Sequence, residues 1–461
     1  MQKARFIVVA LVLSLVVSLA GNVMAQDGTI VDVATGNEDF STLVSLVEAA
    51  GLADTLNGEG PYTVFAPSNA AFEAVPQAVL DYLVANPDLL TAVLTYHVVD
   101  GNVMSADLSE GEIATLDMGN TVDVFVRESG VSINNARVVT ADIEASNGVI
   151  HAVDTLLLPP ISLPEIDPLA VTGNIVSAGS STVFPVTERM ADLFNQDGYP
   201  DTITVDSIGS GAGLERFCPN AETDIANASR PIRQEEIDAC LANGRDPLGF
   251  FVAIDALAIT VSAENDFVDN LTHEDLAAIY SGEAATWADI NAEWPAEPIG
   301  LFSPGSDSGT YDYFVEEIFD EDEGPIQNAE GVQFSEDDNV LVQGVEGSPY
   351  AIAYFGFAYY QENQELLRAI PIEGVEPNEE TGATGEYALS RPLFIYSSPN
   401  IMQEKPQVAS FINYYLNNVN AQLGTASDQI GYIPTTDYIA RRNALLFYAG
   451  LNADPATFMG M

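Results

Sequence analysis

The stretch SAGSSTVFPVTERMADLF, residues Ser177 to Phe194, passes from small hydroxyl and glycine residues directly into a helical pattern. Pro185 suits the first turn of a helix, which is therefore predicted to open near Thr182. Free backbone N–H groups and the positive end of the helix dipole would then point out of a Gly-Ser-Ser-Thr turn, an arrangement that binds anions without a metal. The apolar residues that follow recur at i, i+4, i+7 and i+8, one face of an amphipathic helix: Val186, Met190, Leu193 and Phe194.

The overall negative charge of the chain is unfavourable for binding an anion. There are 14 basic and 68 acidic residues, a formal net charge of -54, and Lys3 and Lys405 are the only lysines. This charge excludes nucleic acid as a partner, because binding to phosphate backbones depends on lysine and arginine. An acidic, lysine-poor surface fits either salty or acidic surroundings, where screening or protonation relieves self-repulsion. Composition leaves both environments open.

The first residues have the pattern of a secretory signal peptide. Lys3 and Arg5 precede an apolar run from Phe6 to Leu19, and small residues end at Ala25, after which cleavage is expected. The alternative is a single membrane span, but the run is short for the roughly 20 apolar residues that a bilayer core needs. No cysteine follows the run, so no lipid anchor is expected. The mature protein is predicted to be exported and extracellular, on the cell surface or periplasmic.

A proline-rich segment divides the rest of the chain. Leu156 to Gly173, LLLPPISLPEIDPLAVTG, lacks helical and strand periodicity and is typical of a semi-rigid linker. The predicted division is a signal peptide over 1–25, one domain over 28–160, a linker over 161–170 and a large or two-lobed domain over 171–450.

The cysteines, Cys218 and Cys240, form an even pair in an apparently exported protein, which favours a disulfide between them. The pair lacks C-x-x-C spacing, so a structural role is expected.

Three pieces of the first region follow one another in a distinctive order. YTVFAPSNAAF (62–72) reads as a strand and a helix-capping turn, the Tyr96-His97 pair ends a helical pattern, and 147–159 reads as a glycine turn and a final strand. Together they resemble a fasciclin (FAS1) domain, which implies a mixed α/β module with a role in adhesion. His97 and His151 have no third histidine or cysteine nearby, so hydrogen-bonded histidines, and no metal site, are expected.

In the second region, three more predicted helices are preceded by small hydroxyl or glycine residues, as in the opening stretch. SIGSGAGLERFC begins a helix at Ser210 and Gly211, DIANASRPIRQEEI places Ser229 and Arg230 before a proline, and FSPGSDSGTYDYFVEEIF places 306–310 before an apolar face. Each start alone is explained by ordinary helix capping. As a set they supply N–H and hydroxyl donors for a tetrahedral oxyanion, with Arg230 as the charge. The alternative for Arg230 is a surface arginine paired with a carboxylate.

This constellation resembles the phosphate-binding proteins of bacterial phosphate ABC transporters, bilobal periplasmic binding proteins of type II. The resemblance covers roughly 171–434, and VAIDALAITVS is expected at a crossing between the lobes. The marks in order are GSSTVFP, GSGAG, DIANASRPI, VAIDALAITVS, IYSGEAATWADI, SDSGTYDYF, DDNVLVQGVEGSPYAIAYFGFAYY, YALSRPLFIY and IGYIPT. The fold class predicted for the whole chain is therefore α/β: a mixed α/β fasciclin domain followed by a bilobal binding domain.

The resemblance implies a phosphate site made of residues carried over by position. Some family members place an aspartate where Arg230 stands and an arginine where Pro304 stands, so this chain departs from their pattern. Asp307 could replace that aspartate as acceptor of the phosphate proton, with helix capping as its alternative role. The candidate ligand residues are Ser181, Thr182, Val183, Ser210, Gly211, Ser229, Arg230, Asp307, Ser308, Gly309 and Thr310.

The expected function is an exported phosphate-binding protein that feeds an ABC importer, with inorganic phosphate and ABC permease subunits as partners and a further cell-surface or matrix partner for the fasciclin module. No cofactor is expected. No sequence motif of a serine hydrolase, a zinc protease or a P-loop enzyme is present, so a non-enzyme is predicted. Two alternatives stay open: an adhesion or scavenging protein that binds an oxyanion without transport, and an anion-binding fold that has become a phosphatase.

Overall fold

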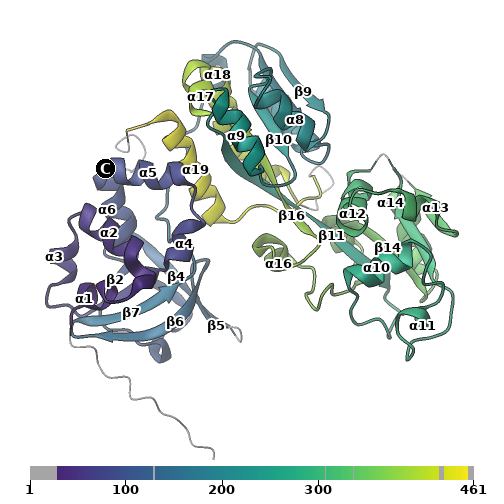
Figure 1. The fold of residues 1–461 in the computed structure, drawn as a ribbon, viewed down its shortest axis with the longest axis horizontal. Helices are drawn as coiled ribbons and strands as arrows, with labels where there is room; N and C mark the ends of the chain where they lie inside the picture. The colour runs from purple at the N-terminus through teal and green to yellow at the C-terminus, as the bar shows by residue number, and fades with distance from the viewer. Residues whose placement is uncertain (1–27, 128–129, 307, 336, 425–429, 455–461) are drawn as a thin grey trace, which may run out of the picture. The chain divides into compact units, whose positions relative to one another are not determined.

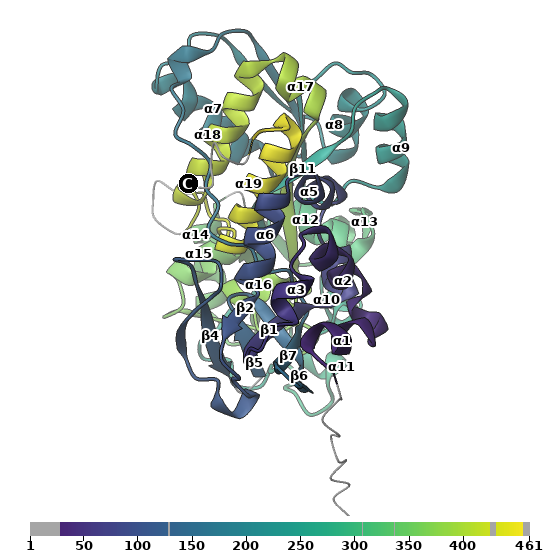
Figure 2. The ribbon, with the colours of Figure 1, turned by 90° about the vertical axis from the view of Figure 1, so that its left-hand side faces the viewer.

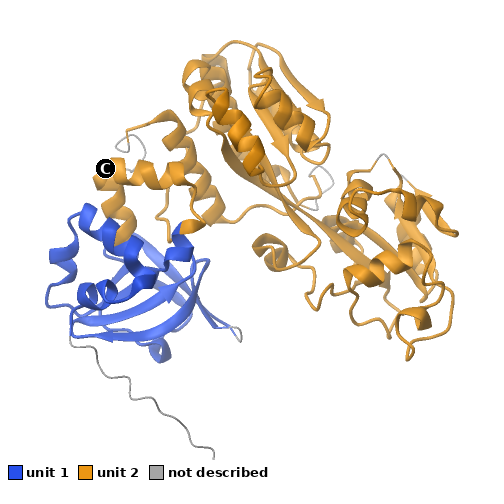
Figure 3. Cartoon of the chain, viewed as in Figure 1, with its two compact units in different colours: residues 1–72, 97–155 blue, residues 73–96, 156–461 orange. Residues whose placement is uncertain are grey.

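The computed structural model describes residues 28–127, 130–306, 308–335, 337–424 and 430–454 (Figure 1). The predicted signal peptide and Asp307 lie outside the described residues. Contacts divide the chain into two compact units (Figure 3). Within the described ranges, unit 1 holds residues 28–72 and 97–155, and unit 2 holds residues 73–96 and 156–454.

Unit 1 is built on a sheet that, over the described residues, has seven strands in the order β2-β1-β7-β6-β5-β4-β3. The strands are β1 (Tyr62–Pro67), β2 (Val98–Asp100), β3 (Gly111–Ala114), β4 (Thr121–Arg127), β5 (Gly130–Ile133), β6 (Ala136–Ala145) and β7 (Gly148–Val153). β1 and β7 are parallel neighbours, with Tyr62 opposite Gly148. The strands of the two fasciclin-like pieces, at 62–67 and 148–153, therefore lie side by side although they are far apart in sequence.

Helices and polar side chains complete this unit. His151 is fully buried in β7, where its Nδ1 accepts from the Asp142 backbone N–H at 3.2 Å and its Nε2 lies 2.9 Å from the Val103 carbonyl oxygen. This histidine is therefore a hydrogen-bonded core residue, as predicted. The helical segments are α1 (Ile30–Thr35), η1 (Glu38–Phe40), α2 (Ser41–Ala49), α3 (Ala53–Leu56), α4 (Asn69–Glu73) and η2 (Ser105–Asp107).

Unit 2 contains two lobes that share one long strand. Over the described residues its sheet has nine strands, in the order β13-β12-β14-β11-β16-β10-β8-β9, with β15 paired to β11. The strands are β8 (Ile175–Gly179), β9 (Ile203–Ser207), β10 (Ile225–Ala228), β11 (Leu248–Ser262), β12 (Gly300–Pro304), β13 (Val332–Ser335), β14 (Ala351–Gly356), β15 (Leu367–Ala369) and β16 (Ser390–Ser397).

Strand β11 passes from one lobe to the other (Figure 1). Its residues Leu248–Ala256 pair with β16, which also pairs with β10, whereas its residues Leu257–Val261 pair with β14. We call the part with β8, β9, β10 and β16 the first lobe, and the part with β12, β13, β14 and β15 the second lobe. VAIDALAITVS therefore lies at a crossing between the lobes, as predicted.

Helices cover both lobes. In the first lobe they are α7 (Phe184–Gln196), α8 (Ser210–Phe217), α9 (Gln234–Ala242), α17 (Pro399–Glu404), α18 (Pro406–Gln422) and α19 (Asp437–Leu451). In and beside the second lobe they are α10 (His273–Tyr280), α11 (Trp287–Ile290), α12 (Gly309–Phe319), α13 (Gly324–Asn328), α14 (Asp338–Glu346), α15 (Phe357–Glu362) and α16 (Glu379–Thr384). The remaining short segment is η3 (Pro168–Ala170).

The predicted apolar face of α7 forms part of the first lobe's core. Val186, Met190 and Phe194 are fully buried, while Leu193 is half-buried. Phe194 contacts the rings of Tyr199, Phe411 and Tyr414, so α7 packs on α18. α7 begins at Phe184, two residues after the predicted start near Thr182, with Pro185 in its first turn.

Unit 2 also includes two helices from earlier in the chain, α5 (Gln77–Ala85) and α6 (Pro87–Tyr96), which Figure 2 shows beside α19. The Tyr82 hydroxyl donates to the Ala453 carbonyl oxygen at 2.5 Å. In the proline-rich segment, Leu156–Leu158 are buried, and the Leu158 carbonyl oxygen accepts from Arg441 Nη1 at 2.7 Å. The hydrogen bond from Arg441 ties the start of the segment to α19.

Among the described residues, we find no single helix with both the length and the hydropathy of a membrane span. In the part of the chain that the structure describes, only α5 and α6 taken together reach that composition, and they are bent by 111° relative to each other.

A disulfide joins Cys218, at the end of α8, to Cys240 in α9, as predicted. Both cysteines are fully buried, and they are separated by 22 residues in sequence. The bond therefore ties two helices of the first lobe together.

Removing this disulfide should destabilise unit 2. A Cys218→Ala, Cys240→Ala double variant is expected to lose roughly 3 kcal/mol of unfolding free energy, because the unfolded chain regains the entropy of a closed loop of that size. Urea unfolding followed by circular dichroism measures the loss. Reductant should shift the wild-type transition and leave the double variant unchanged. A wild-type protein that is equally stable after complete reduction would contradict the prediction.

Candidate anion-binding site

A cavity of about 440 Å³ in unit 2 is lined by residues of both lobes. Its lining combines small hydroxyl and glycine residues, arginines and carboxylates. The first lobe contributes Ser180, Ser181, Thr182, Gly209, Ser210, Gly211, Ser229, Arg230, Arg233 and Arg391. The second lobe contributes Asp312, Val315, Glu316, Glu321 and Glu323.

The order of the parallel strands brings the predicted helix starts together. β8 pairs in parallel with both β9 and β10, so the carboxyl ends of all three strands lie at one edge of the sheet. The loops that follow them begin at Ser180, Ile208 and Ser229 and carry the small polar residues of the cavity. Ligands of open α/β sheets bind at such an edge, because loops and helix N-termini converge there.

Two glycines allow α8 to approach this edge closely. Gly179 has φ +149°, and a Cβ at this position would lie 2.1 Å from the Asn227 carbonyl oxygen of β10. A Cβ at Gly213 in α8 would lie 2.4 Å from the Gly179 Cα atom. A side chain at position 213 would push α8 away from β8, and a side chain at position 179 would push β8 away from β10. Either change would alter how Ser210 is placed beside Ser229.

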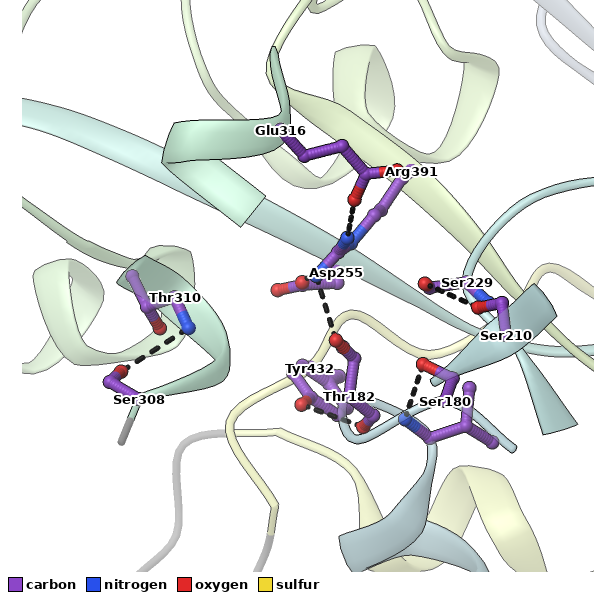
Figure 4. A network of polar contacts seen from close by, with 11 residues as sticks. Ser180, Thr182, Ser210, Ser229, Asp255, Ser308, Thr310, Glu316, Arg391 and Tyr432 are labelled. Carbon is purple, nitrogen blue, oxygen red and sulfur yellow. Dashed lines mark hydrogen bonds and ion pairs between the residues drawn. The ribbon is translucent and has the colours of Figure 1, made fainter. Parts of the chain in front are cut away.

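Two of the predicted helix starts are in direct contact. The Ser229 backbone N–H donates to the Ser210 hydroxyl oxygen at 3.1 Å, and the two hydroxyl oxygens are 3.2 Å apart (Figure 4). Ser210 opens α8, and Ser229 directly follows β10. The structure therefore brings together hydroxyls that are separated by 19 residues in sequence.

Arg230 lines the cavity and is paired with a carboxylate of its own lobe. Its Nη2 and Nη1 atoms donate to the two oxygens of Glu236 at 2.8 and 2.9 Å. Burial raises the pKa of the Glu236 carboxyl, but the hydrogen bonds from Arg230 and Arg233 outweigh it and hold the pKa below its ordinary value. Arg230 therefore lines the cavity and also forms an ion pair with a carboxylate, which was the alternative considered from the sequence.

Arg391 of β16 is the arginine that the sequence reasoning missed. Its side chain is 7% exposed, and its guanidinium donates to three groups: Nε to Asp255 at 3.1 Å, Nη1 to Glu316 at 2.8 Å and Nη2 to the Thr182 hydroxyl at 2.7 Å (Figure 4). The guanidinium also lies 3.8 Å from the centre of the Tyr313 ring in α12. A signal was present in YALSRPLFIY, where an arginine stands in a mostly apolar strand.

The partners of Arg391 come from three parts of unit 2. Asp255 lies opposite Arg391 in the β11–β16 register, Glu316 belongs to α12 of the second lobe, and Thr182 precedes α7 of the first lobe. The Tyr432 hydroxyl donates to the Thr182 carbonyl oxygen at 2.9 Å and fixes this loop from a further segment. Burial raises the pKa of the Asp255 carboxyl, against the opposing effect of Arg391.

The remaining predicted residues have different positions. Val183 is fully buried and is not among the residues that line the described cavity. Ser308 caps α12 by accepting from the Thr310 backbone N–H at 3.2 Å. A Cβ at Gly309 would lie 3.7 Å from the Thr182 hydroxyl oxygen, so the start of α12 lies beside the first-lobe loop. Ser308, Gly309 and Thr310 are close to the described lining without being part of it.

The described lining of the cavity holds both signs of charge. Three arginines come from the first lobe, whereas four carboxylates come from the second lobe. Burial raises the pKa of the Asp312 carboxyl within this lining. No group of three or more histidine, cysteine or carboxylate side chains is arranged to hold a metal ion among the residues that the structure describes. The donors in this part of the chain are hydroxyls, backbone N–H groups and arginines.

Comparison with known families supports this architecture. A family model described as a PBP superfamily domain matches residues 168–419, more than half of the chain. The chain belongs to the PBP superfamily. A fasciclin domain model matches residues 38–159, so this PBP superfamily protein also carries a fasciclin domain. The predicted combination of families and the predicted fold class are both confirmed.

Two named relatives and one solved structure are similar to this PBP superfamily protein. Phosphate-binding protein PstS of Staphylococcus saprophyticus is 36% identical over 280 residues, which are 59% of this chain and 84% of the relative. Protein SphX of Synechococcus elongatus is 39% identical over 274 residues, 56% of this chain and 77% of the relative. The solved structure of a possible phosphate binding protein from Planctomyces limnophilus is 33% identical, with a TM-score of 0.54, and covers 61% of this chain and 99% of its own.

The intact Arg391–Asp255 ion pair should add little to the free energy of unfolding, whereas removal of one partner should lower that free energy strongly. Arg391→Met leaves Asp255 buried without its cation and is expected to cost about 3–5 kcal/mol of unfolding free energy. Adding Asp255→Asn removes the isolated charge and should recover most of that loss. Urea unfolding of the single and double variants measures both values. Equal stability of the two variants would contradict this reading of the pair.

Proposed function

We propose that this protein is an exported phosphate-binding protein, the substrate-binding component of a phosphate ABC importer, whose fasciclin domain serves attachment or adhesion. The observation that carries the proposal is the convergence of loops after β8, β9 and β10 on one cavity with arginines in its lining. The choice of phosphate as the ligand rests on analogy with relatives named phosphate-binding protein PstS. The predicted leader at 1–25 supports export, and a permease complex is the partner.

The proposed ligand set combines both lobes. Ser181, Thr182 and Val183 would offer backbone N–H groups and a hydroxyl, while Ser210, Gly211 and Ser229 would offer donors from the neighbouring loops. Arg230 and Arg391 would supply charge. From the second lobe, the proposal includes Asp307, which lies outside the described residues, together with Ser308, Gly309 and Thr310.

A strongly acidic chain can hold an anion in such a place because binding is decided locally. Hydrogen bonds to Arg391 in a mostly buried setting are screened little by water, whereas the many surface carboxylates act through solvent and salt. At physiological ionic strength the Debye length is about 8 Å, so distant acidic residues contribute weakly to the affinity. Their main effect is slower encounter with an anion at low salt.

We propose the same division of the chain as the sequence predicts: a leader over 1–25, a fasciclin domain over 28–160, a linker over 161–170 and the binding domain over 171–450. The proposed activity is binding without catalysis and without a cofactor. The presence of the fasciclin domain favours one second candidate, a surface protein that scavenges phosphate without a permease. Loss of phosphate uptake on deletion of the gene would favour transport, and unchanged uptake would favour scavenging.

Phosphate should bind to the full chain without a metal. Isothermal titration calorimetry in the presence of EDTA is expected to give one site per chain, and a parallel titration with sulfate measures selectivity. Absence of heat with phosphate at millimolar concentration would refute the proposed function. Release of phosphate from a phosphomonoester by the purified chain would contradict the non-enzyme assignment.

Replacing Arg230 should weaken phosphate binding. Arg230→Ala is expected to cost about 1.5–3 kcal/mol, which is about ten- to more than a hundredfold in Kd, because a charged hydrogen-bond donor is lost from the cavity. Arg189→Ala is the matched control, since Arg189 lies in α7 of the same lobe and bonds Gln422 at 3.0 Å without lining the cavity. An equal effect of both substitutions would mean that Arg230 acts only through overall charge.

A further inference from the structure

The two carboxylates on Arg391 differ in how firmly they are held. Asp255 is 4% exposed and lies directly opposite Arg391 in paired strands, so a carboxylate released from Arg391 would stay buried without a cation. The Glu316 side chain is 39% exposed and reaches Arg391 from α12 of the second lobe. Water can solvate Glu316 after release, and exposed ion pairs are held weakly. Asp255 is therefore a permanent partner, whereas Glu316 is exchangeable.

The exchangeable bond lies inside the candidate anion site. Arg391 and Glu316 both line the 440 Å³ cavity, and the Nη2 atom of the same guanidinium is bonded to Thr182, a proposed ligand residue. The Glu316 carboxylate thus lies where Arg391 would donate to a bound anion from the side of the second lobe (Figure 4). Two anionic groups at one guanidinium nitrogen compete for the same donor.

We propose that Glu316 is a built-in competitor of the ligand: its carboxylate occupies the anion's place on Arg391, and the anion binds by displacing it. This inference rests on the proposed function, because it concerns the same cavity and takes an oxyanion as ligand. The measured affinity is then the intrinsic affinity reduced by the fraction of molecules in which Arg391 is free of Glu316. Displacement also breaks a bond between the lobes, since Glu316 belongs to the second lobe and Arg391 to the first. The bound anion would take the place of that bond.

The test is Glu316→Gln, titrated with phosphate and with sulfate by calorimetry on the full chain at pH 7.5. A neutral amide competes poorly for a guanidinium, so both anions should bind about three- to tenfold more tightly than to wild type. Glu316→Ala, which removes the competing group entirely, should tighten binding at least as much. Because Glu316 is partly exposed, neither variant is expected to unfold the chain.

Glu321→Gln is the matched control. Glu321 lines the same cavity, and none of the hydrogen bonds or ion pairs between described residues joins its carboxylate to an arginine. The control removes the same charge from the cavity and measures the general electrostatic gain. Tightening by Glu316→Gln that exceeds this control at least about threefold supports direct competition at Arg391.

Three results separate the possibilities. If wild-type protein binds no phosphate, the proposed function fails. If wild type binds and Glu316→Gln binds no more tightly than Glu321→Gln, the competitor proposal is wrong and the proposed function stands. If Glu316→Gln weakens phosphate binding but not sulfate binding, Glu316 is itself a ligand that accepts the phosphate proton, which also overturns the proposal.

Discussion

The guanidinium of Arg391 is a contact point at which the crossing strand β11, helix α12 and the loop before α7 meet. It lies where β11 and β16 pair at the crossing between the lobes, and its partners belong to the crossing strand, to α12 and to the loop before α7. Stacking on Tyr313 adds a further contact with α12. A mostly buried cation needs hydrogen-bond acceptors that compensate its charge. Here each acceptor belongs to a different structural element. The same contacts that satisfy the charge therefore position both sides of the cavity.

Geometry explains how a chain with a net charge of -54 can contain a cavity that we propose binds an anion. Parallel pairing of β8, β9 and β10 gathers three loops at one edge of the sheet, and close packing at Gly179 and Gly213 brings α8 within reach of β10. The resulting donors act over hydrogen-bond distances, where they outweigh distant surface carboxylates. Acidic residues also line the cavity itself: carboxylates of α12 and of the residues after it share the lining with the arginines.

Much of this organisation could be predicted from local sequence. The spacing of Val186, Met190 and Phe194 identified a helix whose apolar face is buried, and the cysteine pair identified a disulfide that the structure contains. Ordered motifs identified both families. Each of these signals is local or motif-based, so no knowledge of distant contacts was needed.

The features that escaped prediction depend on contacts between distant residues. The role of Arg391 arises because it contacts Glu316 of α12, Asp255 of β11 and Thr182 before α7, which are 75, 136 and 209 positions away in sequence. The grouping of α5 and α6 with α19 likewise follows from tertiary packing. The most direct test of the central claim is a crystal structure of the full chain with phosphate bound. Phosphate in the cavity near Thr182, Ser210 and Ser229, bonded to Arg391 with Glu316 released, is the predicted result. Phosphate bound elsewhere, or bound while Glu316 still holds Arg391, would contradict it.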